Sequence, residues 1–267
     1  MPGPGVSILL IGAGRMGSAL LKGWQSNRVK SIIVIEPKPS AQIRVLAKAK
    51  AITLLDAPSQ VKARIDACIV AIKPQILKGE APALAAIAEK SLMISIAAGT
   101  SVAALQKAWG KKARIVRAMP NTPGAIGRGI TGLYAARGVG AADRKKADAL
   151  LSALGQTVWV KSEPLIDSVT ALSGSGPAYV FHLVEAMTQA GIAIGLSKGD
   201  AQKLSRATVA GAGALLDADS AAAADLRIAV TSPGGTTEAA LKVLMPELTD
   251  LMTRALQAAK RRAEELR

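Results

Sequence analysis

The run from Thr231 to Glu238 combines hydroxyl side chains and glycines in a pattern suited to binding a small anion. It reads Thr-Ser-Pro-Gly-Gly-Thr-Thr-Glu, and a helix-like Ala/Leu/Lys stretch follows it. The two glycines let the backbone turn N–H groups toward one point, and the positive end of a helix adds to their attraction for a carboxylate or phosphate. A helix cap needs only one hydroxyl. The run therefore favours an anion site, with an ordinary capped turn as the alternative.

A second candidate site is the glycine-rich segment Gly12–Gly17. It reads Gly-Ala-Gly-Arg-Met-Gly, follows the apolar run Val6–Ile11 and begins an apolar-periodic helix that extends to about Trp24. In such a loop the first glycine makes the turn, the second lets the backbone approach a pyrophosphate, and the third allows close packing of helix and strand. An acidic residue, Glu36, ends the next apolar run, Ser31–Ile35, at about the spacing of twenty residues found in dinucleotide-binding folds. This context predicts a dinucleotide site.

The residues after the second apolar run leave the choice between NAD and NADP open. Glu36 can accept hydrogen bonds from the adenosine ribose, which favours NAD. Lys38, Ser40 and the basic character of this half of the chain favour a 2′-phosphate, and hence NADP. We expect use of both NADP(H) and NAD(H).

Two further segments are expected at the same edge of the sheet. Ala71–Pro74 and Ala97–Gly99 both follow apolar runs, and ligands of open α/β sheets bind at the carboxyl ends of the strands. The small residues at 97–99 allow a flat nicotinamide ring to lie against the backbone, with a plain strand-to-helix turn as the alternative. The predicted cofactor-binding residues are Ile11, Gly12, Ala13, Gly14, Arg15, Met16, Glu36, Lys38, Ala71, Ile72, Lys73, Pro74, Ala97, Ala98 and Gly99.

Apolar runs and helix-like stretches alternate through the first half of the chain, which predicts a doubly wound parallel sheet of the Rossmann type. From Leu165 onward no strand signal remains. The composition shift near Lys161 predicts two domains, 1–160 for dinucleotide binding and 161–267 for an all-α domain. Besides the two runs above, strands are expected at Asp66–Ile72, Ser91–Ile96, Ala113–Arg117, Gly129–Ala135 and Thr157–Val160, and helices around 141–154, 177–195, 198–216, 234–244 and 246–266.

The helical half is expected to need a second copy of the chain. Half of all residues are apolar but only 2% are aromatic, so the core must be aliphatic and rich in alanine. A few alanine-rich helices bury little surface by themselves. We therefore expect their apolar faces to be completed by a second subunit, in at least a homodimer.

The charge is concentrated in the first half of the chain. Residues 1–160 contain 23 Lys and Arg against seven Asp and Glu, whereas residues 161–267 contain 11 against 12. The first half therefore attracts anions. Nucleic acid is disfavoured because the cations are spread thinly and few aromatic residues are present to stack on bases. A small phosphorylated ligand fits better.

Single residues narrow the remaining chemistry. Cys68 lies in an apolar run and is expected to be a buried small hydrophobe, which leaves no disulfide framework or thiolate metal site within one chain, and no metal site is predicted. His182 is expected to be structural rather than catalytic. The Gly/Ser turn Leu172–Tyr179 is either a tightly packed helix start or part of a site. No apolar stretch reaches about 18 residues, so no membrane span is expected. No leader pattern is found, and we therefore expect a cytoplasmic location.

Taken together, these residues resemble the pyrroline-5-carboxylate reductase family. The resemblance covers nearly the whole chain, and the turn Thr231–Thr237 is highly specific to the family. The segments that carry it are Ile11–Gly17, Ile72–Gln75, Ser95–Thr100, Arg117–Pro123, Leu165–Asp167, Ala171–Tyr179 and Val230–Leu241. The resemblance implies an enzyme that reduces the C=N bond of 1-pyrroline-5-carboxylate with NAD(P)H to give L-proline, the last step of proline biosynthesis. It also implies dimers that interlock through the helical domain and often assemble into decamers.

The resemblance also implies roles in binding a cyclic imino acid. The N–H groups of Gly235 and Thr236 and the hydroxyl of Ser232 would hold the substrate carboxylate, and Thr237, the predicted catalytic residue, would hydrogen-bond the ring nitrogen. By the same resemblance, Glu163 and Thr170 would lie near the substrate or the channel that leads to it. The proton donor stays open, since protonation of the substrate could replace a protein acid.

Two departures and two rival functions accompany this interpretation. In many family members the residues at the positions of Ala229 and of the run Ser220–Ala224 are more polar. These departures bear on the affinity for the ligands. A β-hydroxyacid dehydrogenase would need a helical lysine with a polar partner one turn later. The segment Gly199–Lys203 imitates the lysine, but Ala207 stands at the partner position. A dinucleotide-binding redox sensor would have no use for the hydroxyl-rich turn at 231–237.

Overall fold

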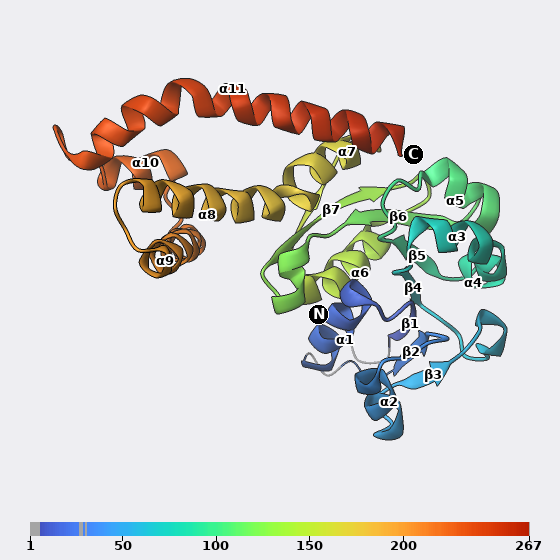
Figure 1. Cartoon of the computed structure of the whole chain (residues 1–267). Helices are drawn as coiled ribbons and strands as arrows, with labels where there is room; N and C mark the ends of the chain where they lie inside the picture. The colour runs from blue at the N-terminus through green and yellow to red at the C-terminus, as the bar shows by residue number, and fades with distance from the viewer. Residues whose placement is uncertain (1–5, 27–28, 30, 267) are drawn as a thin grey trace. The chain divides into compact units, whose positions relative to one another are not determined.

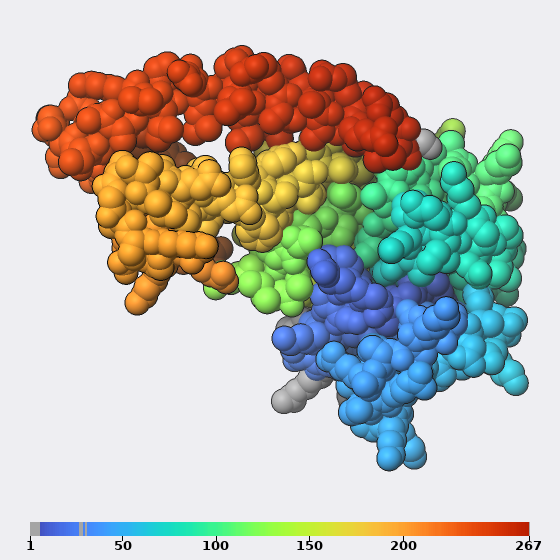
Figure 2. All heavy atoms as spheres, viewed as in Figure 1, coloured from blue at the N-terminus to red at the C-terminus, as the bar shows by residue number. Residues whose placement is uncertain are grey.

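The structure is a computed structural model in which residues 6–26, 29 and 31–266 are described. The chain divides into two compact units (Figure 1). The first, here called the sheet unit, comprises Met1–Gly174 together with Lys260–Arg267, and the second, the helical unit, comprises Ser175–Ala259. Figure 2 shows the same view with all heavy atoms, in which side chains fill the spaces between the ribbons of the sheet unit. Each unit is described by itself.

The sheet unit is built on one eight-stranded sheet with the order β3-β2-β1-β4-β5-β6-β7-β8. The strands are β1 (Ser7–Ile11), β2 (Ser31–Ile35), β3 (Thr53–Leu55), β4 (Ala67–Val70), β5 (Leu92–Ser95), β6 (Arg114–Met119), β7 (Gly129–Ala135) and β8 (Gly155–Trp159). The first six are parallel, β7 is antiparallel to β6, and β8 is parallel to β7. The predicted Rossmann-type sheet is confirmed. The short strand β3 was not predicted, and neither was the reversal at β7.

Helices cover both faces of this sheet because the strands are apolar on both sides. Alternate residues of β1 point to opposite faces, so Ile8 and Leu10 join one buried cluster while Leu9 and Ile11 join another. The first cluster is covered by α1 (Arg15–Ser26), α2 (Ala41–Lys48) and α6 (Ala141–Leu151), and the second by α3 (Pro74–Glu80), α4 (Ala85–Ala88) and α5 (Val102–Trp109). Short 3₁₀ turns complete the unit at Pro58–Gln60, Ala81–Leu84, Thr122–Ile126 and Ser152–Leu154.

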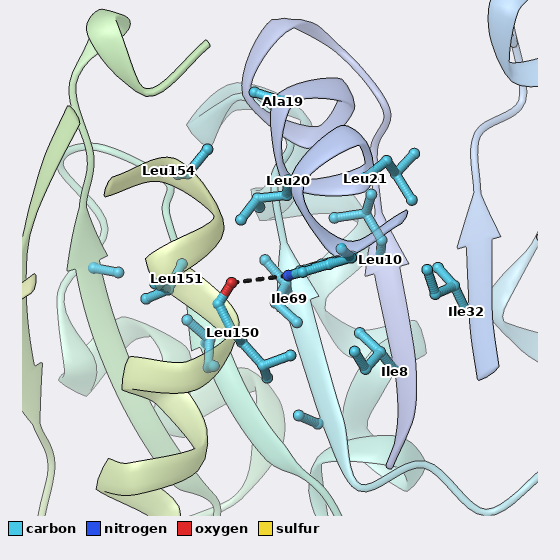
Figure 3. Close-up of a cluster of buried hydrophobic side chains, with 14 of the residues drawn as sticks. Ile8, Leu10, Ala19, Leu20, Leu21, Ile32, Ile69, Leu150, Leu151 and Leu154 are labelled. Carbon is cyan, nitrogen blue, oxygen red and sulfur yellow. Dashed lines mark hydrogen bonds between the residues drawn. The ribbon is translucent and has the colours of Figure 1, made fainter. Parts of the chain in front are cut away.

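The core of the sheet unit is closed within one chain. Figure 3 shows α1 and α6 packed together over β1 and β4 through Leu20, Leu150 and their neighbours. The indole Nε1 of Trp24, which is fully buried, donates to the carbonyl oxygen of Leu150 at 2.8 Å. Cys68 is fully buried in the second cluster, as predicted, and this burial raises the pKa of its thiol.

The described residues of the last part of the chain form helices and connecting turns and no strand, as predicted. The turn α7 (Leu165–Val169) and the π-helical segment Thr170–Gly174 belong to the sheet unit, so the compact division falls at Ser175. The helical unit contains α8 (Gly176–Ala193), α9 (Lys198–Ala218), α10 (Ala223–Ala229) and most of α11 (Thr236–Glu265). Helices α8 and α9 pack against each other and form one orange mass in Figure 2. The domain limits 1–160 and 161–267 stay a prediction.

One helix prediction in this region is wrong, and one helix was missed. The segments 234–244 and 246–266 form the single helix α11, with Pro246 inside it. A proline removes one backbone hydrogen bond and disturbs one turn, and the good helix formers on both sides carry the helix past it. The seven-residue α10 was not predicted. None of the helices in the described residues is long and apolar enough to cross a membrane.

Candidate cofactor and substrate sites

The glycine loop between β1 and α1 has the backbone geometry that a dinucleotide loop requires. Gly12 has a φ of +89°, and its N–H donates to the carbonyl oxygen of Ile35 at 2.9 Å. A Cβ at Gly12 would lie 2.6 Å from the Cγ2 of Ile72 and 2.8 Å from the carbonyl oxygen of Ala71. Both the conformation and the space therefore demand glycine at this position.

The other two glycines have different roles: Gly17 allows close packing, and Gly14 leaves space for a ligand. A Cβ at Gly17 would collide with the carbonyl oxygen of Gly12, so this residue lets α1 approach the strand end closely. Gly14 is exposed, and a Cβ there would meet no atom within 4 Å. Since α1 begins at Arg15, its free N–H groups and positive end face this open position. The loop fits a dinucleotide pyrophosphate.

Glu36 joins this loop to the end of β2. Its Oε2 accepts from the N–H of Ala13 at 2.9 Å, and its Oε1 accepts from the N–H of Lys38 at 3.1 Å. The hydroxyl oxygen of Ser40 accepts from the N–H of Ile43 at 3.4 Å and thereby caps α2. Glu36 keeps lone pairs for a ribose, and the Lys38 side chain is exposed for a phosphate. The choice between NAD and NADP therefore stays open at this position.

The remaining predicted cofactor residues lie beside this loop at the carboxyl ends of β4 and β5. The N–H of Ala71 donates to the carbonyl oxygen of Ile11 at 2.8 Å, and the N–H of Ile96 donates to that of Val70 at 3.1 Å. Lys73 is exposed at the start of α3, with Pro74 at the first helical position. The structure thus brings the predicted cofactor residues to one edge of one unit. Their contact with a cofactor stays a prediction.

The turn before α11 uses some of its donors internally. The hydroxyl of Thr231 donates to the carbonyl oxygen of Arg227 at 2.6 Å, and Gly234, at a φ of +71°, donates its N–H to the Oε2 of Glu238 at 2.6 Å. The N–H of Gly235 donates to the carbonyl oxygen of Ser232 at 3.0 Å. Of the groups predicted to hold a carboxylate, the Gly235 N–H therefore has a partner within the turn.

The first turn of α11 supplies the donors that stay available. The N–H groups that begin a helix have no partner within it, and α11 begins at Thr236. The side chains of Ser232 and Thr236 are exposed, and Thr237 is half-buried. A hollow of about 500 Å³ lies between α10 and α11 beside this turn, lined by Arg227, Ile228, Thr231, Glu238, Leu241, Lys242, Met245 and Pro246. The turn can present a helix N-terminus and hydroxyl groups to a small anion.

Glu163 and Thr170 lie in the sheet unit and have partners in the protein. The Oε1 of Glu163 accepts from the N–H of Val102 and from the Nη1 of Arg117, both at 2.7 Å. The hydroxyl of Thr170 donates to the carbonyl oxygen of Ile166 at 2.8 Å. The structure therefore places these two predicted substrate residues in a different unit from the turn at 231–238. The sequence pointed to Arg117 only as part of a segment that resembles the family. A charged residue within an otherwise apolar strand was the signal that could have singled it out.

His182 is not packed in the single chain. Its side chain is 80% exposed, and its Nδ1 lies 3.1 Å from the Oε2 of Glu185. The neighbouring Gly/Ser turn, Leu172–Tyr179, begins in the π-helical segment Thr170–Gly174 and continues into α8. Such segments are frequent at functional sites.

Comparison with known proteins assigns the chain. Residues 163–266 match the family model for pyrroline-5-carboxylate reductase dimerisation, and residues 7–99 match that for NADP oxidoreductase, coenzyme F420-dependent. The pyrroline-5-carboxylate reductase of Pseudomonas aeruginosa is 40% identical over 262 residues, which cover 97% of this chain and 96% of the relative. The chain belongs to the pyrroline-5-carboxylate reductase family.

Solved structures of relatives agree with this assignment. A pyrroline-5-carboxylate reductase from Coxiella burnetii has a TM-score of 0.92 at 36% identity, covering 98% of each chain. A Plasmodium falciparum pyrroline carboxylate reductase, solved with NADP bound, has a TM-score of 0.81 at 25% identity, covering 99% of each chain. The predicted family and fold class are confirmed.

Proposed function

We propose that this chain reduces the C=N bond of 1-pyrroline-5-carboxylate with NAD(P)H to give L-proline. The observation that carries the proposal is the family match over 97% of the chain, which includes both the glycine loop and the hydroxyl-rich turn. The two ligand classes match the two candidate sites. The open Gly14 position and the α1 N-terminus suit a dinucleotide, and the α11 N-terminus suits one carboxylate.

Binding and orientation are the main tasks of the protein in this reaction. The cofactor, when bound, supplies the hydride. On the substrate side, the first N–H groups of α11 and the hydroxyl of Ser232 hold the carboxylate, with the backbone of Gly235 and Thr236 shaping the turn. The hydroxyl of Thr237 hydrogen-bonds the ring nitrogen. Holding the ring carbon at attack distance supplies much of the rate enhancement.

None of the protein groups named so far on the substrate side is a good acid, so the proton on the ring nitrogen must already be present on the substrate. A threonine hydroxyl is a poor acid, so Thr237 is proposed to orient the ring nitrogen rather than to protonate it. A protonated imine accepts hydride more readily than a neutral one. We therefore propose that the substrate enters as the iminium.

On the cofactor side, NADP(H) and NAD(H) are both proposed. The family model for residues 7–99 describes an NADP oxidoreductase, and the Plasmodium relative was solved with NADP bound. Glu36 can accept from the ribose hydroxyls of NAD, and Lys38 can pair with the extra phosphate of NADP. The proposed contacts comprise the glycine loop, these two residues and the segments Ala71–Pro74 and Ala97–Gly99.

The helical half carries a dimerisation domain, and we propose that the assembled form is a homodimer of this chain. The apolar side chains exposed on α8 and α11 support this assembly, among them Phe181 at 64% and Leu251 at 56%. Further assembly of dimers into a decamer is the finer proposal, and a mass measurement in solution separates the two. The cytoplasmic location stays a prediction.

Oxidation of NADPH and NADH in the presence of pyrroline-5-carboxylate, compared with a set of 2- and 3-hydroxy acids, tests the function. We expect turnover with the imine and none with the hydroxy acids. Turnover with a 3-hydroxy acid alone would favour the dehydrogenase reaction instead. The ratio of kcat/KM for NADPH and NADH measures whether the contact of Lys38 with the extra phosphate or that of Glu36 with the ribose contributes more.

A further inference from the structure

Arg117 is a buried charge on a strand of the sheet unit. It lies in β6, where its side chain is only 4% exposed. A guanidinium cannot lose its proton in a protein, and burying it without a partner is strongly unfavourable. Its partner is Glu163, whose Oε1 lies 2.7 Å from the Nη1 of Arg117.

The same carboxylate oxygen also holds the start of α5. The Oε1 of Glu163 accepts from the N–H of Val102, the first residue of that helix, at 2.7 Å across 61 residues of sequence. Ser101 caps the helix separately, because its hydroxyl oxygen accepts from the N–H of Ala104 at 3.2 Å. Because Ser101 already caps α5, the role of Glu163 goes beyond capping this helix. It ties α5 to β6 and to the segment that enters α7.

The segment fixed in this way is the turn between β5 and α5. The N–H of Ala97 donates to the hydroxyl oxygen of Ser95 at 3.4 Å, which holds the beginning of the turn. Gly99 has a φ of +67°, and a Cβ there would lie 2.6 Å from the carbonyl oxygen of Leu266. Glu163 holds the end of the turn at Val102. The turn is thus bonded to Ser95 at its beginning, packed closely at Gly99, and tied to a distant part of the sheet unit only at its end, through Glu163.

We propose that Glu163 and Arg117 are positioning residues that fix the turn at 97–101 for the nicotinamide end of the cofactor. This inference rests on the proposed function, and it replaces the role in substrate contact that the resemblance implied for Glu163. The Oε1 of Glu163 already has two protein donors at 2.7 Å. If the turn is loosened, the plane of the nicotinamide ring shifts, whereas the substrate keeps its position. Misplacement of about 1 Å lowers the rate of hydride transfer about 100-fold while substrate binding changes little.

Amide hydrogen exchange of residues 97–104, measured by mass spectrometry on the protein without ligands, tests the positioning directly. In Glu163→Ala we expect exchange of this segment to rise about tenfold or more, because Val102 and the turn lose their tether. Glu163→Gln keeps an oxygen that accepts from Val102, so its exchange should lie between those of Glu163→Ala and the original chain. Glu89→Ala, an exposed acid in the same unit, serves as the matched control and should leave the segment unchanged.

Steady-state kinetics separates positioning from substrate contact. For Glu163→Ala we expect kcat to fall about tenfold or more, the KM for pyrroline-5-carboxylate to stay within about twofold, and Glu163→Gln to recover part of kcat. A raised KM for the imine with unchanged exchange and kcat would overturn the proposal and assign Glu163 to the substrate. If Glu163→Ala does not fold, Arg117→Lys replaces it with the same readouts, and unchanged exchange in that variant would overturn the proposal. Failure of the original chain to reduce the imine would contradict the proposed function alone, since the exchange measurement needs no turnover.

Discussion

The two units of this chain solve the problem of burial in opposite ways. The sheet unit closes its core by itself, with Leu9, Leu10 and Val34 fully buried between strands and helices. In the helical unit, α8 and α10 contain no buried residue, and large apolar side chains such as Phe181 are exposed. Exposed apolar area of this kind marks an interaction surface. The sheet unit is a complete domain, whereas the helical unit is one half of an interface.

The difference extends to the candidate sites. The glycine loop is built from contacts between sequentially distant strands, and its residues are fixed by a core that one chain completes. The turn at 231–238 is held by local hydrogen bonds to Arg227, Glu238 and Ser232 at the start of a largely exposed helix. We therefore expect cofactor binding to survive damage to the dimer, and substrate turnover to depend on it.

The largest effect is expected from placing a charge on the exposed apolar face of α8. Phe181→Asp removes an aromatic anchor that a two-fold interface counts twice, so the dissociation constant of the dimer should rise about 1000-fold. Sedimentation velocity measures this change, and calorimetry should show NADPH binding unchanged within about twofold. The control Gln202→Asp adds the same charge at an exposed polar position of α9. A Phe181→Asp dimer as tight as the original would contradict the comparison between the units.

The second effect separates two glycines of the cofactor loop. Gly12→Ala places a methyl group against Ile72 and Ala71 at a φ of +89°, and we expect it to destabilise the sheet unit by about 2–4 kcal/mol. Gly14→Ala has free space in the protein, so its melting temperature should not change. Its added methyl should meet the pyrophosphate instead and raise the Kd of NADPH about tenfold or more. Unchanged NADPH binding in Gly14→Ala would mean that the pyrophosphate does not lie at this loop.

A smaller effect is expected inside the sheet unit. Trp24→Phe removes the hydrogen bond to the carbonyl oxygen of Leu150 and leaves a small cavity beside it, which should lower the free energy of unfolding by about 1–3 kcal/mol. Denaturant titration measures the loss, and the dimer dissociation constant should not change. A weakened dimer in this variant would show that the two units are not energetically separate.

The smallest effect is expected at Cys68. Burial raises the pKa of its thiol and removes it from solvent, so a thiol reagent at pH 8 should not react with the native protein. Reaction should appear only in denaturant. Phe181→Asp should not speed the reaction, because the core around Cys68 belongs to the sheet unit. Rapid labelling of either native protein would contradict the closed core.

The sequence predicted most of the sheet unit because its signals are local. Apolar runs predicted seven of the eight strands, five of them by a run that ends at a glycine or proline, and the loop at Gly12–Gly17 predicts the edge at which a cofactor would bind. The strand β3 was missed because it has three residues, and its side chains are exposed or half-buried. The direction of β7 was missed because it depends on how the segment between β6 and β7 folds back, which no periodicity records.

The predictions failed where a result depends on distant or cooperative interactions. Pro246 predicted a break, but a long helix continues past one lost hydrogen bond. The bond between Arg117 and Glu163 joins residues 46 positions apart, so only the folded sheet shows that they meet. The sequence pointed to Glu163 through resemblance alone. The structure supplies its partners.

The central claim is that the sheet unit binds the cofactor and the turn at 231–238 binds the substrate. Thr237→Ala tests it most directly, through kcat/KM for pyrroline-5-carboxylate and calorimetric binding of NADPH to the same preparation. The account predicts a loss of about 100-fold in kcat/KM, an NADPH Kd unchanged within about twofold, and partial recovery of turnover in Thr237→Ser, which keeps the hydroxyl. A variant that retains full turnover, or that loses NADPH binding, would contradict this division.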